Sequence, residues 1–218
     1  MNSEAMVALT IVVIVAVMAL SALVLFRLRA SLVYRLRALI DSGEYEGFFA
    51  LVDGGAARMV VSPYARRLLL FSAYAKQGDR DRMVEEFNQL MKLNLNSFNR
   101  VNVLTEGFRE FSFVGDAKRC RRIVQAMKDE NVNESCLAAY RQYLDIALEG
   151  KTDERRDIEA RLPSLTGRRL GYAEFLLARI HESANDHKGA EALYEQAALH
   201  MKCSVSDIRR GVNVGTAV

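Results

Sequence analysis

A two-residue turn recurs along this chain at nearly constant spacing. Gly, or Asn as second best, ends a helix because the residue after the last turn adopts a left-handed conformation that a β-carbon penalises. An Asp that follows can accept hydrogen bonds from the free N–H groups at the start of the next helix. The first residues of the five copies lie 35, 37, 35 and 35 positions apart: Gly43-Glu44, Gly78-Asp79, Gly115-Asp116, Gly150-Lys151 and Asn185-Asp186. The spacing therefore predicts repeated units of helix, tight turn and helix.

Apolar residues on both sides of these turns recur at helical spacing. Around the second turn they are Leu69, Leu70, Ala73 and Tyr74 before it, and Met83, Val84, Phe87, Leu90 and Met91 after it. With 13 Gly and 2 Pro in 218 residues, the chain has too few turn-forming residues for a sandwich or barrel of many short strands. We therefore predict an all-α fold.

The last unit matches a known repeat pattern best. Leu177-Ala178 stands where that pattern has Leu-Gly, and Ala190 with Tyr194 fits its Ala-x3-Phe signature. In these positions the chain resembles the tetratricopeptide repeat (TPR) family, whose unit is a 34-residue helix-turn-helix. The resemblance covers roughly residues 29–204 and implies an α-solenoid of about five TPR-like units, in which each hairpin covers the apolar face of the next.

Several positions depart from the family pattern. Glu174 stands where the family often has Trp, and Lys202 where it often has Pro. The fourth unit has Arg155 and Glu159 in positions that are normally small and aromatic. Residues 52–61, which include Gly54 and Gly55, are expected to form a longer loop after the first hairpin.

The N-terminal part of the chain predicts a single transmembrane helix. Residues 5–26 form a run of 22 residues whose only polar side chains are those of Thr10 and Ser21. As a helix this run is about 33 Å long, enough to cross a hydrocarbon core of about 30 Å. A signal peptide is disfavoured because only Glu4 precedes the run, which also exceeds the usual apolar core. A buried core helix would need apolar partners on all sides, and the rest of the chain is amphipathic.

Charge asymmetry predicts the orientation of this helix. No Lys or Arg precedes it, whereas four arginines follow it before the first acid at Asp41: Arg27, Arg29, Arg35 and Arg37. The positive-inside rule then places the short N-terminus outside and the C-terminal domain in the cytoplasm, at the cell (inner) membrane. The four arginines are expected to contact lipid headgroups. Residues 38–218 hold 26 basic and 26 acidic side chains, so this body is neutral and no nucleic-acid partner is expected.

The predicted organisation has four parts. Residues 1–26 form the short N-terminus and transmembrane helix, and residues 27–42 form a basic juxtamembrane helix that continues into the first repeat. Residues 43–204 form the TPR-like domain. Residues 205–218 form a C-terminal cap and a frayed tail, since Ser204 with Asp207 approximates a capping box.

The sequence contains no catalytic motif that would predict an enzyme. It lacks a phosphate-binding G-x-x-x-x-G-K-[ST] loop, a G-x-G-x-x-G, an H-E-x-x-H and a G-x-S-x-G. His200 and Cys203 are three apart on one expected helix, but a metal site needs three or four ligands. The three Cys include no C-x-x-C pair, which favours a reducing compartment. We expect no enzymatic activity, no cofactor and no metal.

The family resemblance implies a concave surface on the first helix of each hairpin, which holds an extended peptide or a helix of another protein. Arg109 and Arg179 would offer paired N–H donors to a carboxylate, and aromatic area beside them would take an apolar side chain. The residues placed on this surface are Asn102, Thr105, Arg109, Tyr140, Tyr172, Phe175 and Arg179. Tyr172 and Phe175 are equally consistent with a place in the core.

Three functions remain open from the sequence. The preferred one is a membrane-tethered adaptor or scaffold whose cytoplasmic TPR-like domain recruits a protein partner. The alternative is a structural or assembly subunit that self-associates through its bilayer helix, where Ala16, Ala19 and Ala22 offer small surfaces but no G-x-x-x-G is present. An enzyme with a distributed active site is the least favoured.

Overall fold

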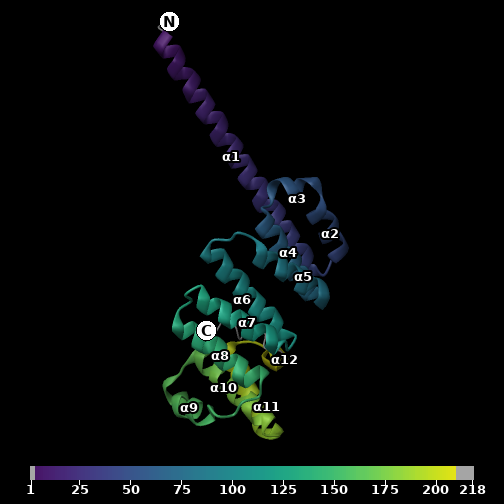
Figure 1. Ribbon diagram of the computed structural model, residues 1–218, viewed down its shortest axis with the longest axis vertical. Helices are drawn as coiled ribbons and strands as arrows, with labels where there is room; N and C mark the ends of the chain where they lie inside the picture. Colours follow the sequence, from purple (N-terminus) through teal and green to yellow (C-terminus); the bar gives the residue numbers. More distant parts are fainter. Residues whose placement is uncertain (1–2, 210–218) are drawn as a thin grey trace. The chain divides into compact units, whose positions relative to one another are not determined.

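The computed structural model describes residues 3–209, with side chains from residue 11 onward. Every regular element within these residues is a helix, which confirms the all-α prediction (Figure 1). The described chain divides into two compact units, residues 1–94 and residues 95–218. The tail expected to fray, residues 211–218, lies outside the described residues.

The first unit contains five α-helices: α1 (Ser3–Ser42), α2 (Tyr45–Asp53), α3 (Gly55–Val60), α4 (Pro63–Gln77) and α5 (Arg80–Lys92). The second contains α6 (Ser97–Phe113), α7 (Ala117–Asp129), α8 (Glu134–Tyr143), the π-helix η1 (Leu144–Leu148), α9 (Arg155–Arg161), the 3₁₀ helix η2 (Leu162–Ser164), α10 (Gly167–Ser183), α11 (His187–Met201) and α12 (Val205–Arg209). Consecutive helices pack as antiparallel neighbours in the pairs α4 with α5, α6 with α7, and α10 with α11.

All five predicted corners adopt the left-handed backbone conformation. The φ angles are positive at each first residue: Gly43 (78°), Gly78 (81°), Gly115 (73°), Gly150 (69°) and Asn185 (60°). The predicted caps are also present, since a side-chain oxygen of each following Asp accepts the backbone N–H three residues on: Asp79 from Arg82, Asp116 from Arg119 and Asp186 from Gly189. Backbone geometry thus confirms the turn chemistry expected from the sequence.

Helix α1 is continuous over 40 residues. Every side chain described between residues 11 and 31 is exposed, and the apolar stretch of the helix buries nothing against the described chain. The helix is therefore long and apolar enough to cross a membrane, and it does not serve as a core helix of the described protein. Only its last turns pack against the other helices of the first unit, where Leu36 and Ile40 are buried.

The core of the first unit forms around those last turns. Leu36 and Ile40 of α1 cluster with Phe48 and Val52 of α2 and with Leu69 and Ala73 of α4. Phe49 stacks on Tyr74 at 5.0 Å between ring centroids. Because α1 contributes two buried side chains to this core, its last turns are an integral part of the unit.

The expectation of a loop at residues 52–61 is wrong. Helix α2 extends to Asp53, and after an extended Gly54 the chain forms α3. Val52, Ala57 and Val61 are buried at 0%, 0% and 3% exposure. Ala57 of α3 and Val61 at its C-cap are four residues apart and thus lie on one side of the helix, and their burial favours a helix in spite of the two glycines.

The second unit departs from regular hairpins near Gly150. Helix α8 continues directly into the π-helix η1, and α9 is only seven residues long. Elsewhere in this unit the packing is close, because a β-carbon at Gly171 of α10 would lie 2.6 Å from Cγ of Met201 and 3.0 Å from the carbonyl oxygen of Ala197. The glycine therefore allows α10 and α11 to approach each other.

Candidate functional site

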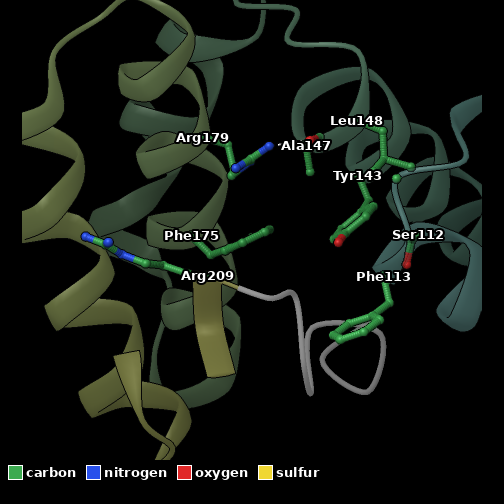
Figure 2. Close-up of a pocket in the computed structure, with 9 residues that line it drawn as sticks. Ser112, Phe113, Tyr143, Ala147, Leu148, Phe175, Arg179 and Arg209 are labelled. Carbon is green, nitrogen blue, oxygen red and sulfur yellow. Dashed lines mark hydrogen bonds between the residues drawn. The ribbon is translucent and has the colours of Figure 1, made fainter. Parts of the chain in front are cut away.

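One hollow of the second unit lies at the C-terminal ends of α6, η1 and α10, beside α12. It has a volume of about 370 Å³ (Figure 2). Nine residues line it: Ser112, Phe113, Gly115, Tyr143, Ala147, Leu148, Phe175, Arg179 and Arg209. We call this set the α10 cavity. Three of its walls come from the helices that precede three consecutive corners, namely α6, α8 with η1, and α10. The cavity thus brings together residues more than 60 positions apart in sequence.

Aromatic rings form one wall of the α10 cavity. Tyr143 and Phe175 stack with their centroids 5.9 Å apart and their planes 16° from parallel. Phe108 meets Tyr143 edge-on on one side, and Tyr194 lies 6.3 Å from Phe175 on the other. Burial raises the pKa of Tyr143, so this phenol stays neutral at physiological pH. The wall therefore offers apolar ring surface and no anionic charge.

Two arginines line the cavity, but the guanidinium group of Arg209 points away from it (Figure 2). Arg179 donates a hydrogen bond to the carbonyl oxygen of Ala147 at 2.8 Å and pairs with Glu182 at 2.7 Å. Arg209 lies over the ring of Tyr194, 5.3 Å from its centroid, and forms an ion pair with Glu191. Arg179 is thus held in place between η1 and α10, whereas Arg209 is half-exposed. The combination of cations beside rings suits a ligand with an acidic and an apolar group.

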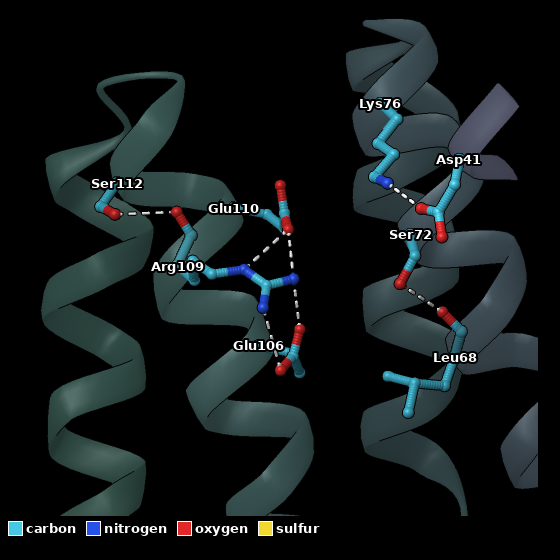
Figure 3. Close-up of polar contacts among 8 residues, drawn as sticks. All are labelled: Asp41, Leu68, Ser72, Lys76, Glu106, Arg109, Glu110 and Ser112. Carbon is cyan, nitrogen blue, oxygen red and sulfur yellow. Dashed lines mark hydrogen bonds and ion pairs between the residues drawn. The ribbon is translucent and has the colours of Figure 1, made fainter. Parts of the chain in front are cut away.

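Of the seven residues predicted to line a binding surface, the α10 cavity brings together Phe175 and Arg179. Phe175 is at the same time a core residue, with 1% exposure. Arg109 lies elsewhere on α6, where its guanidinium contacts Glu106 and Glu110 (Figure 3). These two carboxylates occupy its N–H donors at 2.5 and 2.7 Å, so Arg109 is already satisfied by its own helix.

The other predicted residues lie outside the α10 cavity. Asn102 and Thr105 are half-buried on α6. Tyr140 packs edge-on against Phe108 at 4.8 Å. Tyr172 is buried, and its hydroxyl donates to the carbonyl oxygen of Ala139 at 3.3 Å. It lines a separate cavity of about 160 Å³ with Ile158 and Leu176.

Sequence reasoning missed Tyr143, Phe113 and Arg209 as cavity residues. Phe113 and Arg209 are at helix ends, where no periodicity predicts the direction of a side chain. Tyr143 was missed because Tyr140, one helical turn earlier, was the residue of the fourth unit that we placed on the binding surface. The π-helix that follows Tyr143 has no reliable sequence signal.

A second groove lies between α7 and η1, with a volume of about 520 Å³. Two of its cations contact its two acids: Arg121 pairs with Glu149, and Lys151 contacts Asp145 at 2.5 Å and Glu149 at 3.4 Å. The hydrogen bond from Arg121 lowers the pKa of Glu149. Arg122 and Arg141 also line the groove, so its lining carries more cations than acids.

The histidines near the C-terminus make pairwise contacts. Nδ1 of His200 lies 2.7 Å from Oε2 of Glu174, and Nδ1 of His181 lies 2.7 Å from Oδ2 of Asp186. Among the described residues no group of three or more His, Cys, Asp or Glu side chains is arranged to hold a metal ion.

The arginines that follow the apolar run are exposed on α1. Of these four, Arg29 reaches another helix, because its Nη2 lies 3.5 Å from Oγ of Ser62 at the start of α4. The side chains of Arg27, Arg35 and Arg37 are exposed on the same helix.

Comparison of the chain with protein-family models, with curated proteins and with solved structures finds no match.

Proposed function

We propose that this protein is a membrane-tethered adaptor. In this proposal α1 crosses the cell (inner) membrane with its N-terminus outside, and the TPR-like α-solenoid of about five units recruits a protein partner on the cytoplasmic side. The observation that carries the proposal is the pairing, in one chain, of an apolar helix without a partner among the described residues and a helical body with an aromatic cavity. The same proposal includes no enzymatic activity, no cofactor and no nucleic-acid partner.

The α10 cavity supports a protein ligand more than a small molecule. Its walls come from three consecutive first helices, where the TPR resemblance implies a peptide-binding surface. Phe113 is 53% exposed at the cavity edge, and large exposed aromatic side chains are typical of protein interfaces. A peptide that places an apolar side chain against Tyr143 and Phe175, with an acidic group toward Arg179, would use both kinds of contact.

Site-specific photo-crosslinking in intact cells tests the adaptor. A benzophenone amino acid replaces Phe113 in one variant and Leu199 in the other. Leu199 is a matched control, since it is 75% exposed but lies on α11, outside the cavity. We expect a discrete adduct with another protein from position 113 and none from position 199. We also expect Arg179→Gln to reduce the yield several-fold.

The crosslinking experiment also separates the two leading functions. Co-expression of two differently tagged copies reveals whether an adduct at position 113 joins two copies of this chain. Such an adduct would replace the adaptor by the self-associating subunit. Equal adducts from both positions, or none from position 113, would contradict a partner in this cavity.

Cysteine accessibility tests the orientation of α1. Cys203 is half-exposed on the body of the protein, so a membrane-impermeant maleimide should leave it unlabelled in intact cells and label it after permeabilisation. Labelling before permeabilisation would place the body outside and contradict the orientation expected from the positive-inside rule.

A further inference from the structure

Because α1 is continuous, the number of residues after its apolar run gives the distance of each residue from the end of that run. The apolar run ends at Phe26, and each helical residue adds about 1.5 Å along the axis. Arg29 then lies about 4.5 Å beyond the end of the run and Asp41 about 22 Å beyond it. The headgroup layer of each leaflet is roughly 5 to 8 Å thick, from the difference between the full bilayer and its hydrocarbon core. Arg29 is thus at headgroup depth if α1 spans the bilayer.

Two contacts locate the two ends of α4 along the axis of α1. Near the start of α4, Oγ of Ser62 lies 3.5 Å from Nη2 of Arg29. Near its end, Nζ of Lys76 lies 2.5 Å from Oδ1 of Asp41 (Figure 3). Helix α4 therefore runs parallel to α1, with its first residues near the headgroup layer and its last residues far from it. Figure 1 places α3 at the same end of the unit, where the apolar half of α1 projects.

The segment at this end, which we call the α3 corner, comprises residues 55–62. Ala57 and Val61 anchor it in the unit, since both are buried. Met59 points away from the protein and is 87% exposed, the highest value among the large apolar side chains of the described residues. The neighbouring Arg58 is also exposed, with 62% of its side chain accessible.

Charge around the α3 corner is strongly biased toward positive. No Asp or Glu occurs in residues 5–40 or in residues 54–78, and these two segments meet at the contact between Arg29 and Ser62. The adjacent carboxylate is that of Asp53, which lies 3.9 Å from Arg58 with 61% of its side chain exposed. Such an exposed pair holds Arg58 only weakly.

We propose that the α3 corner docks on the anionic headgroup surface of the bilayer that α1 crosses. Met59 enters the boundary between headgroups and acyl chains, while Arg58, Arg29 and Arg27 contact lipid phosphates. One apolar side chain beside a few cations is the composition of interfacial membrane contacts. The inference rests on the proposal that α1 spans the membrane. It adds a second contact, which holds the first unit at a defined angle to the bilayer.

A single tryptophan can test this docking, because the chain contains none. Three full-length variants are reconstituted in phosphatidylglycerol vesicles with brominated acyl chains, which quench nearby indoles. Met59→Trp probes the α3 corner. Gln77→Trp is the matched control, since it is exposed at the far end of α4. Leu20→Trp reports on the membrane span itself.

The expected order of quenching is strongest for Leu20→Trp, at least twofold above the control for Met59→Trp, and close to the soluble value for Gln77→Trp. Strong quenching of Leu20→Trp with equal, weak quenching of the other two would overturn the α3 corner proposal and leave the span intact. Absence of quenching in Leu20→Trp would overturn the span, and the docking with it.

The charge contribution is tested in the Met59→Trp background. Arg58→Gln should lower the equilibrium constant for docking by on the order of fivefold, the change expected for one basic side chain at an anionic surface. Arg82→Gln, which removes one exposed charge at the far end of the unit, should have no effect. Replacement of phosphatidylglycerol by phosphatidylcholine should also weaken the quenching. Quenching that is insensitive to lipid charge and to Arg58→Gln would overturn the anionic surface as the ligand.

Discussion

At the scale of single residues, the buried carboxylate of Glu174 explains a departure from the family pattern. Glu174 occupies a position where the TPR family often has Trp, yet it is 4% exposed. The contact with Nδ1 of His200, 26 residues later on α11, compensates this burial, because a buried charged or polar group is costly unless it is hydrogen-bonded. In the sequence, His200 suggests only a metal ligand. Its pairing with Glu174 has no sequence signal, because neither residue type predicts a partner at such a distance.

Cys120 yields a prediction at the same scale. Burial raises the pKa of its thiol from 9.0 to about 12, and the thiolate is the reactive form. We expect iodoacetamide at pH 8.5 to modify the half-exposed Cys136 at least tenfold faster than Cys120, as measured by peptide mass spectrometry. Equal rates in the folded protein would contradict the burial of Cys120.

The same pKa shift has a consequence for stability. A thiol with a raised pKa in the folded state contributes stability that is complete below pH 9 and is lost as the pH rises toward 12. Burial of Tyr143 and Tyr172 raises their pKa values and acts in the same direction. The denaturant concentration at the unfolding midpoint should therefore decrease as the pH is raised from 9 to 12. The decrease should be smaller in Cys120→Ala.

At the scale of elements, the left-handed corners determine where one helix ends and the chain reverses direction. The five corners were predictable because the conformational penalty of a β-carbon depends only on the local backbone. The α3 segment was not predictable in the same way, since Gly54 and Gly55 favoured a loop and the burial of Ala57 and Val61 favoured a helix. Tertiary packing outweighed local propensity there.

A comparison of two glycines tests the role of the corners. Gly78 has a φ of 81°, whereas Gly55 has no positive φ, and nothing lies within 4 Å of a β-carbon built on it. Gly78→Ala should destabilise the first unit by about 1 to 2 kcal/mol, the penalty for a left-handed residue with a side chain. Gly55→Ala should be neutral or stabilising by about 0.5 kcal/mol. Equal effects in thermal unfolding would argue against a conformational role for Gly78.

At the scale of the whole molecule, the described chain is organised as two compact units with a division at residues 94 and 95. The sequence pattern contained no sign of this division, because the turn spacing runs through it almost unchanged. The segment between α5 and α6 has no regular structure from Leu93 to Asn96. The division follows from contacts within each unit, and no local pattern encodes them.

Limited proteolysis tests the two units. Chymotrypsin cleaves after Leu, and Leu93 and Leu95 lie in the irregular segment. At low enzyme concentration the first cut should fall there, because irregular backbone is more accessible than backbone within a helix. Mass spectrometry should then find fragments that end or begin at residues 93–96. A first cut inside α6 or α10 would contradict this organisation.

The sequence by itself determined the all-helical class, the five corners with the Asp caps at three of them, and one helix apolar enough to span a bilayer. These features depend on local backbone conformation and on the polarity of consecutive residues, and both can be read from neighbours in the chain. Only the tertiary structure decided that Tyr143, Phe175 and Arg209 share a cavity, that Glu174 pairs with His200, and that Met59 is exposed beside α1. Each of these depends on packing between residues far apart in sequence, where rotation of a helix by one residue changes every contact.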